Sequence, residues 1–400
     1  MNYEYMSLHL RKCTLLGRMV YVVLTTKLLG FELKSPLIAA SGPPTRDLDC
    51  IRQLADAGVG AIITKTILLN PSINPRPCLY RGRGYFLNTE RCSTIPLQRW
   101  LNNELPRLKE LDIPVIASIG MTPGEVEQLA DQVVRAGADM LELSIFTPYD
   151  DPSSMVEAIR RVKNAVDVPV SVKLSANVHD IVEFGLAVRN AGADAISAID
   201  ALKAGLHVDL ETRYPAMLEQ GFGRISGEAI KELALYHVAQ LAHYVGLPLI
   251  GTGGVMSGGD ALEMISCGAT TVGVCTALIV NGAQSVTAMN EQMVQFMHEH
   301  DLHTLDQIRG EVLTQIDFPS SIEERREYEK QLTDASKRVA FIEQDECTRC
   351  QTCYRVCLYG AVEKLGGKFF IHPSCCEGCG LCVSMCPVGA IHYGEEGGEH

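Results

Sequence analysis

Cysteines are concentrated near the end of this 400-residue chain. Nine of the fifteen follow residue 346, and eight of these form two runs, CTRCQTCYRVC from Cys347 and CEGCGLCVSMC from Cys376. In each run, two residues lie between the first and second cysteines and two between the second and third, and three residues lie between the third and fourth. No signal peptide is visible, so we expect a cytoplasmic, reducing setting, in which metal sites are commoner than disulfides.

The spacing C-x2-C-x2-C-x3-C is the ligand pattern of ferredoxins with two [4Fe–4S] clusters, in which the fourth cysteine of each run binds the other cluster. A structural zinc site, which usually takes two separated pairs of ligands, fits this spacing poorly. Leu358 stands where the second run has proline, and Cys375 lies outside the pattern and is predicted not to be a ligand. We assign the first cluster to Cys347, Cys350, Cys353 and Cys386, and the second to Cys376, Cys379, Cys382 and Cys357.

Short apolar runs alternate with amphipathic stretches over residues 36–300. The runs are β-branched and lack polar alternation, as parallel strands buried on both faces do. Repeated β-then-α units predict an α/β protein, a (β/α)8 TIM barrel followed by a small α+β ferredoxin-like domain. A doubly wound open sheet is the alternative, but no switch point is obvious. The predicted strands are 36–41, 60–65, 113–119, 139–146, 168–174, 193–199, 247–253 and 269–275.

The predicted barrel has long insertions at 66–95 and 200–225, after the second and sixth strands. Both belong to the C-terminal face, where barrel active sites are built. The glycine-rich GTGGV after the seventh strand and CTALIVNG after the eighth are typical of a phosphate site made by backbone N–H groups. Lys65 and Lys173 end two strands, and such lysines could stabilise an anionic reduced flavin. A flavin can transfer one or two electrons, so it suits a barrel that must exchange single electrons with iron–sulfur clusters.

Composition and charge set further limits. The net charge of −13 argues against nucleic-acid or anionic-membrane partners. The apolar run at 14–24 is too short to span a bilayer, and Arg18 interrupts it. We divide the chain into an N-terminal extension, the barrel, a charged helical linker and the ferredoxin-like domain, at residues 1–24, 25–316, 317–340 and 341–400. Met19 is one candidate for the true start. The alternative is a short N-terminal helix packed on the barrel.

Several longer motifs resemble the dihydroorotate and dihydropyrimidine dehydrogenase family, in its form with a barrel followed by a ferredoxin domain. They are SPLIAASG, TKT, SVKL, GRISGEAIK and IGTGGVMSGGDALEMISCGATTVGVCTAL, and the resemblance covers residues 27–393. It implies an FMN site in which Cys275 stands where the family often has glycine. The implied FMN residues are Ala40, Ser41, Lys65, Thr66, Ser144, Lys173, Gly227, Gly253, Gly254, Cys275 and Thr276, with Gly253, Gly254, Cys275 and Thr276 around the phosphate.

The loop after the fourth strand departs from that family, which reads N-x-S-C-P or N-x-S-S-P where this chain has SIFTP. Ser144 replaces a flavin-contacting asparagine, and Thr147 replaces the residue that moves a proton to or from the substrate carbon. Oxidation of a C–C bond beside a carbonyl pairs hydride transfer with proton transfer, so we expect Thr147 to carry that proton through a relay. The alternative is that Thr147 is an ordinary loop residue.

The substrate side departs as well. By resemblance Asn88 pairs with the ring amide, while Asp200 takes an asparagine position. An ionised aspartate only accepts hydrogen bonds. It would repel the carboxylate of orotate unless Lys203, Arg81 or Arg83 intervenes, so we expect a neutral or cationic ring instead. Glu90 and Tyr149 are further candidates for this end of the site.

Together these features predict an oxidoreductase that uses FMN and two [4Fe–4S] clusters and acts on a CH–CH or C=C bond of a dihydropyrimidine-like substrate. No dinucleotide fingerprint is present, so an NAD(P)H-dependent flavoprotein subunit or a ferredoxin must exchange the electrons. The segment 341–400 has four Lys or Arg against eight Asp or Glu and would dock to a basic patch. The alternatives are an ene-reductase acting on a non-pyrimidine metabolite and an electron-transfer subunit with a non-catalytic barrel. The family also suggests a homodimer.

Overall fold

The computed structural model describes residues 14–15, 18–19, 22–215, 221–321, 324–325 and 338–395. It divides into two compact units, Met1–Asp317 and Phe318–His400. Most of the predicted N-terminal extension and linker lies outside the described residues, so their boundaries stay predictions. Within the extension, β1 (Thr14–Leu15) pairs antiparallel with β2 (Arg18–Met19).

Eight parallel strands close into a barrel in the first unit, which confirms the predicted (β/α)8 fold rather than an open sheet. Strands β9 and β10 are buried at every residue. The near-continuous apolar runs reflect this double burial, because helices cover the outer face and side chains fill the interior. The barrel strands are β5 (Leu37–Ala39), β6 (Ala61–Ile63), β9 (Val115–Ile119), β10 (Met140–Leu143), β11 (Val170–Ser175), β12 (Ala195–Asp200), β17 (Leu249–Thr252) and β18 (Thr271–Val274).

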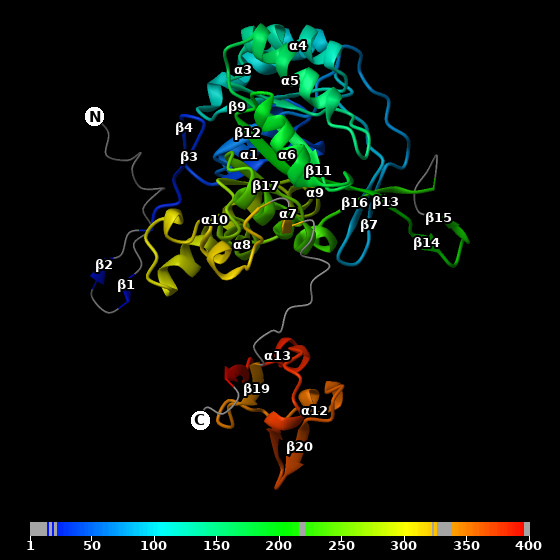
Figure 1. Ribbon diagram of the computed structural model, residues 1–400. Coiled ribbons are helices and arrows are strands. Elements are labelled where there is room, and N and C mark those ends of the chain that lie inside the picture. The colour runs from blue at the N-terminus through cyan, green and yellow to red at the C-terminus, as the bar shows by residue number, and fades with distance from the viewer. Residues whose placement is uncertain are drawn as a thin grey trace. The chain divides into compact units, whose positions relative to one another are not determined.

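Amphipathic helices surround these strands (Figure 1). Helix α4 (Pro123–Ala136) shows how the sequence sets their limits. Thr122 caps its first turn by accepting the Glu125 N–H, and Gly137 ends it at φ +125°, a conformation that favours glycine. The other longer helices are α1 (Leu48–Asp56), α5 (Ser153–Ala165), α6 (Ile181–Asn190), α7 (Lys231–Tyr244), α8 (Gly258–Ser266) and α10 (Gln284–Glu299), and the short ones are α2 (Leu97–Arg99), α3 (Leu105–Leu108) and α9 (Thr276–Asn281).

The two predicted insertions meet in one antiparallel sheet of four strands, in the order β13, β16, β8, β7. Strands β7 (Leu79–Arg81) and β8 (Phe86–Asn88) come from the first insertion, and β13 (Leu202–Gly205) and β16 (Gly223–Ser226) from the second. Figure 1 shows this sheet extending to one side of the barrel, with the small hairpin of β14 (Val208–Asp209) and β15 (Tyr214–Pro215) beyond it. A second hairpin, β3 (Thr26–Leu28) with β4 (Phe31–Leu33), precedes the barrel.

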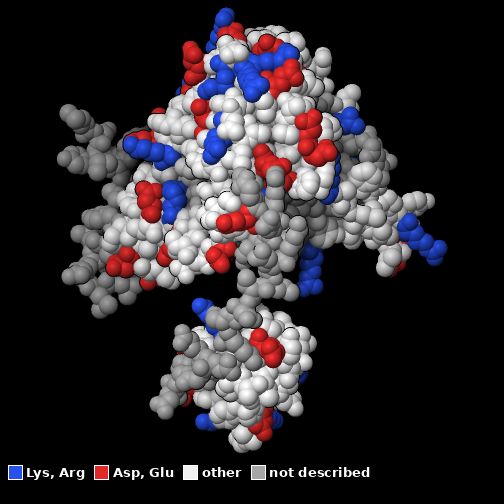
Figure 2. Space-filling model, viewed as in Figure 1, with Lys and Arg blue, Asp and Glu red and all other residues white. Residues whose placement is uncertain are grey.

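Surface charges of both signs intermingle on the viewed face of the barrel unit (Figure 2). The net charge of −13 is therefore not gathered into one acidic patch on that face. No helix in the described part of the chain is long and apolar enough to cross a membrane.

The second unit is a small α+β domain, as predicted. Strand β19 (Arg338–Ile342) pairs antiparallel with β22 (Ile391–Glu395), and the hairpin of β20 (Val362–Leu365) and β21 (Lys368–Ile371) turns through two glycines. Two short helices, α12 (Thr352–Val356) and α13 (Leu381–Ser384), follow the cysteine-rich loops. Its small core includes Phe369, which is 1% exposed, together with two of the nine cysteines of this unit, Cys353 and Cys376.

Candidate active site

A cavity of about 620 Å³ opens at the C-terminal ends of the barrel strands. This volume lies within the range of small-molecule and cofactor sites, about 300–1,000 Å³. All but one of the residues implied for FMN line it, and so do Asn88 and Asp200. The exception is Gly227, whose neighbour Ser226 takes its place at the wall. The lining residues from that set are Ala40, Ser41, Lys65, Thr66, Ser144, Lys173, Gly253, Gly254, Cys275 and Thr276.

Glycines allow the phosphate end of this cavity to form. Gly253 and Gly254, directly after β17, have φ of +119° and +78°. A Cβ on Gly254 would lie 2.4 Å from Lys231 Cα, and one on Gly42 would lie 2.5 Å from Cys275 Sγ. At both places a side chain in place of the glycine hydrogen would clash, so glycine permits the close approach to the Lys231 backbone and to the Cys275 side chain. The residues present therefore fit a phosphate-bearing cofactor.

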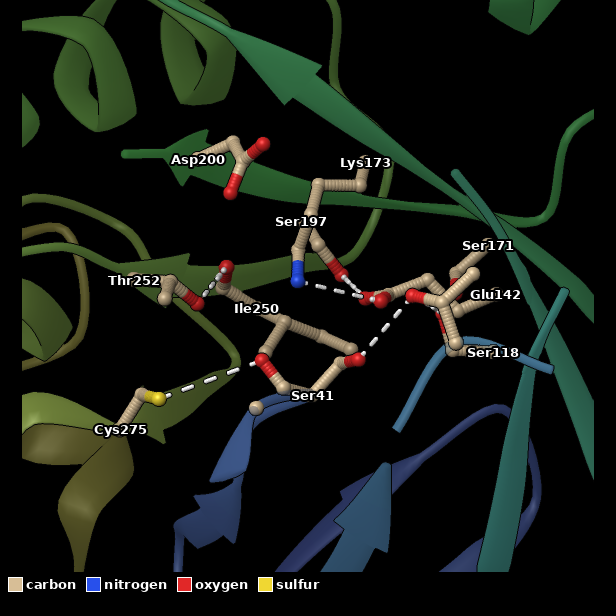
Figure 3. Close-up of polar contacts among 12 residues, drawn as sticks. Ser41, Ser118, Glu142, Ser171, Lys173, Ser197, Asp200, Ile250, Thr252 and Cys275 are labelled. Carbon is tan, nitrogen blue, oxygen red and sulfur yellow. Dashed lines mark hydrogen bonds and ion pairs between the residues drawn. The ribbon is translucent and has the colours of Figure 1, made fainter. Parts of the chain in front are cut away.

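Lys173 forms an ion pair with a buried carboxylate, Glu142, which is not among the site residues expected from the sequence. Glu142 is 0% exposed, and its Oε1 lies 3.2 Å from Lys173 Nζ, while Ser197 Oγ donates to its Oε2 at 2.6 Å (Figure 3). Burial alone would lower the pKa of Lys173, but Glu142 and Asp200 outweigh it and raise that pKa. Lys173 is thus charged at neutral pH. Glu142 could have been noticed as an acidic residue inside a strand predicted to be buried.

Lys65 is also paired. Its Nζ lies 2.5 Å from Glu90 Oε2, and both side chains are largely buried, 7% and 13% exposed. Asn74 donates to Glu90 Oε1 at 3.1 Å, and the Glu90 N–H donates to Asn88 Oδ1 at 2.5 Å. The carbonyl oxygen of Asn88 is therefore engaged within the loop, which leaves its amide N–H groups to donate.

Hydroxyl groups connect the strand ends beside the lysines. Thr66 Oγ1 lies 3.3 Å from Ser41 Oγ and 3.0 Å from Ser118 Oγ, and Figure 3 labels the two serines. Cys275 Sγ lies 3.9 Å from the Ser41 carbonyl oxygen, and burial raises the pKa of this thiol to about 11. The Cys275 side chain is therefore neutral at physiological pH, and only its backbone N–H is suited to a phosphate.

Asp200 pairs with a residue that the sequence reading did not consider. Arg224 Nη1 lies 3.1 Å from Asp200 Oδ2, and both side chains line the cavity. Lys203 lines it too, whereas Arg81 and Arg83 do not. Arg224 belongs to the motif GRISGEAIK, but its partner comes from a different strand, and the sequence alone gives no sign of that pairing.

Thr147 does not line the cavity. Its hydroxyl donates to the Ile145 carbonyl oxygen at 3.1 Å, within its own loop. The structure thus does not bring the predicted proton carrier to the other site residues. Tyr149 is exposed and stacks on His179, also away from the lining. A different proton-bearing group, Cys92, does line the cavity, and burial raises the pKa of its thiol.

Eight of the nine cysteines of the second unit surround two small cavities of about 20 Å³ each. Cys375 lines neither. Backbone N–H groups point at two sulfurs, from Ala361 to Cys357 at 3.2 Å and from Gly378 to Cys376 at 3.4 Å. Such bonds stabilise thiolates and tune iron–sulfur clusters. The first cavity is lined by Cys347, Cys350, Cys353 and Cys386, and the second by Cys357, Cys376, Cys379 and Cys382, which are the two crossed sets that the spacing predicts.

Comparison with known proteins finds a match for the barrel and another for the cysteine-rich unit. Residues 23–297 match the dihydroorotate dehydrogenase family, and residues 369–392 match the 4Fe-4S binding domain. Similar proteins include two that are named dihydroorotate dehydrogenase B (NAD(+)), catalytic subunit. The one from Geobacter sp. (strain M21) is 34% identical over 70% of this chain and 95% of its own length. The one from Methanothermobacter thermautotrophicus is 31% identical over 73% of this chain and 99% of its own length.

Proposed function

Because this chain belongs to the dihydroorotate dehydrogenase family and carries a 4Fe-4S binding domain, we propose that it is an FMN- and iron–sulfur-dependent oxidoreductase. It acts on the CH–CH or C=C bond of a dihydropyrimidine-like ring. Electrons pass between the substrate, the flavin and two [4Fe–4S] clusters, and reach or leave the chain through a partner protein.

One observation carries this proposal. A single cavity at the C-terminal face of the barrel collects ten of the eleven implied flavin residues from six of its strand ends, and the implied substrate residues Asn88 and Asp200 with them. FMN, when bound, would accept a hydride from a carbon of the substrate ring or donate one to it. The chain itself supplies the charge of Lys173, held in place by Glu142, and the donor groups of Asn88.

The clusters and the partner are proposed from the cysteine sets. Soft thiolates in fours, each set bordering its own small cavity, suit two [4Fe–4S] clusters that share their fourth ligands crosswise. Clusters of this kind move one electron at a time. We therefore propose a redox partner, either an NAD(P)H-dependent flavoprotein subunit or a ferredoxin.

A second candidate is an electron-transfer subunit whose barrel binds FMN without turning over a substrate. The position of Thr147 favours it, because the residue expected to carry the proton contacts its own loop instead of the cavity.

The test is anaerobic. The purified chain should contain one FMN and about eight irons, as two four-iron clusters require. With a reduced viologen dye as electron donor, it should then consume dye and uracil together. FMN and iron at these levels, with no dye oxidation by uracil, thymine or orotate, would favour the electron-transfer subunit or an ene-reductase with another substrate.

A further inference from the structure

We propose that Asp200 and Arg224 act together as the specificity-determining pair for a neutral cyclic amide, binding its N–H and its adjacent C=O, and that they disfavour a ring that carries a carboxylate. This inference rests on the proposed function and narrows its substrate class. Neither the family motifs nor the names of similar proteins assign a role to Arg224.

Both members of the pair line the cavity: Arg224 belongs to the four-stranded sheet of β13, β16, β8 and β7, here called the accessory sheet, and Asp200 lies at the end of β12. Arg224 of β16 stands opposite Asn88 of β8 in the antiparallel register, and Asp200 is the last residue of β12. All three line the cavity. They therefore bring together two donors and one acceptor in the wall of the cavity.

Burial distinguishes this ion pair from the other two at the site. Lys65–Glu90 and Lys173–Glu142 are buried, and each carboxylate also accepts a further hydrogen bond, from Asn74 and Ser197 respectively. The side chains of Asp200 and Arg224 are 36% and 49% exposed. A half-exposed ion pair holds its members only weakly, so both can exchange partners when a ligand displaces water.

The hydrogen-bonding capacity of the pair defines the ligand. An ionised aspartate accepts only, and a guanidinium donates only. An N–H beside a C=O satisfies both at once, and ligand burial strengthens these charge-assisted bonds. A carboxylate at the same place would satisfy Arg224 but confront Asp200 with a like charge. The buried carboxylate Glu90 has already taken up Lys65, so this lysine is not free to offset that repulsion.

Lys203 and Arg91 are exposed cations of the cavity lining that could attract a ring carboxylate. The Nζ of Lys203 lies 5.6 Å from the centroid of the Phe146 ring. A ring carboxylate turned outward would meet these cations. The experiment therefore compares two ligands that differ only in that carboxylate.

The test is equilibrium binding to the oxidised full chain with FMN bound, followed by the change in the flavin absorption band, with uracil and orotate as ligands. Neither ligand is turned over by the oxidised flavin. We expect uracil to bind at least about tenfold more tightly than orotate, and Asp200→Asn to shift this ratio by about tenfold or more toward orotate. Arg224→Gln should weaken uracil binding by a similar factor.

Arg81→Gln is the matched control, because Arg81 is an exposed arginine of the same accessory sheet that does not line the cavity. It should leave both dissociation constants unchanged. Tighter binding of orotate than of uracil by the unmodified chain, or an unchanged ratio in Asp200→Asn with FMN still bound, would overturn the inference and leave the proposed function standing. Binding of neither pyrimidine to the flavin-loaded chain would overturn both.

Discussion

Removing the cation above Glu142 should destabilise the barrel strongly. Glu142 is fully buried, and Lys173 is its ion-pair partner at 3.2 Å. Breaking a buried pair leaves an uncompensated charge, which typically costs about 3–5 kcal/mol. We therefore expect Lys173→Met to lose about that much of the free energy of unfolding, and Glu142→Leu to lose a similar amount. Most domains have only about 5–15 kcal/mol in total, so either loss is easily measured.

The double variant Glu142→Leu/Lys173→Met should recover most of that loss, because it leaves no charge unpaired. Replacing both members of a buried pair by apolar residues is often close to neutral. If the two single effects were independent, the double variant would lose about 6–10 kcal/mol. We expect a loss of only about 1–3 kcal/mol, which corresponds to a coupling of several kcal/mol between the two side chains.

Urea unfolding of the full chain without flavin measures these values, with Trp100 fluorescence as the signal. Trp100 is the only tryptophan, is 0% exposed and belongs to the barrel unit, so it reports on that unit. Omitting the flavin keeps ligand binding from contributing to the apparent stability. Additive losses in the double variant would refute the reasoning that the two charges compensate each other.

Three further predictions concern other parts of the chain. Cys353→Ala should lose iron, by iron analysis, and keep FMN; a variant with full iron would refute the assigned ligand sets. Asp260→Asn should lower stability by about 1 kcal/mol at pH 7, because the Met256 N–H and Lys231 outweigh burial and lower the pKa of Asp260. A lowered pKa contributes stability that is fully present above the unfolded value of 3.8, so the difference should shrink below that value and disappear as the pH falls through the lower folded-state pKa. Single-turnover flavin reduction by dihydrouracil should distinguish the two candidate proton carriers: Thr147→Ala slows it if Thr147 acts, whereas Cys92→Ser slows it if the cavity-lining thiol acts.

The barrel was predictable because its signal is local and repeated. Each strand–helix unit shows its own burial pattern and stop signals, as α4 does with Thr122 and Gly137. The grouping of the cysteines was predictable for a related reason. Ligand spacing within each run reflects the geometry of one loop around one cluster, and the structure brings together the same two sets.

Cross-strand relations were not predictable. The register of Arg224 opposite Asn88 joins residues more than one hundred positions apart, and no local pattern specifies that pairing. From the sequence, therefore, Lys203, Arg81 and Arg83 are the candidates to intervene between Asp200 and a ring carboxylate, and Arg224 is not among them. The orientation of Thr147 depends on the conformation of its loop, where a hydroxyl can satisfy a nearby carbonyl as readily as a substrate.

The central claim is that the barrel cavity oxidises or reduces a pyrimidine-type ring through a flavin. The most direct measurement mixes the oxidised, FMN-loaded full chain with dihydrouracil under anaerobic conditions and follows the flavin absorption band in a single turnover. We predict that the band bleaches and that uracil forms in the same amount. An unchanged band with dihydrouracil, dihydrothymine and dihydroorotate, in a chain that holds both FMN and iron, would contradict the claim.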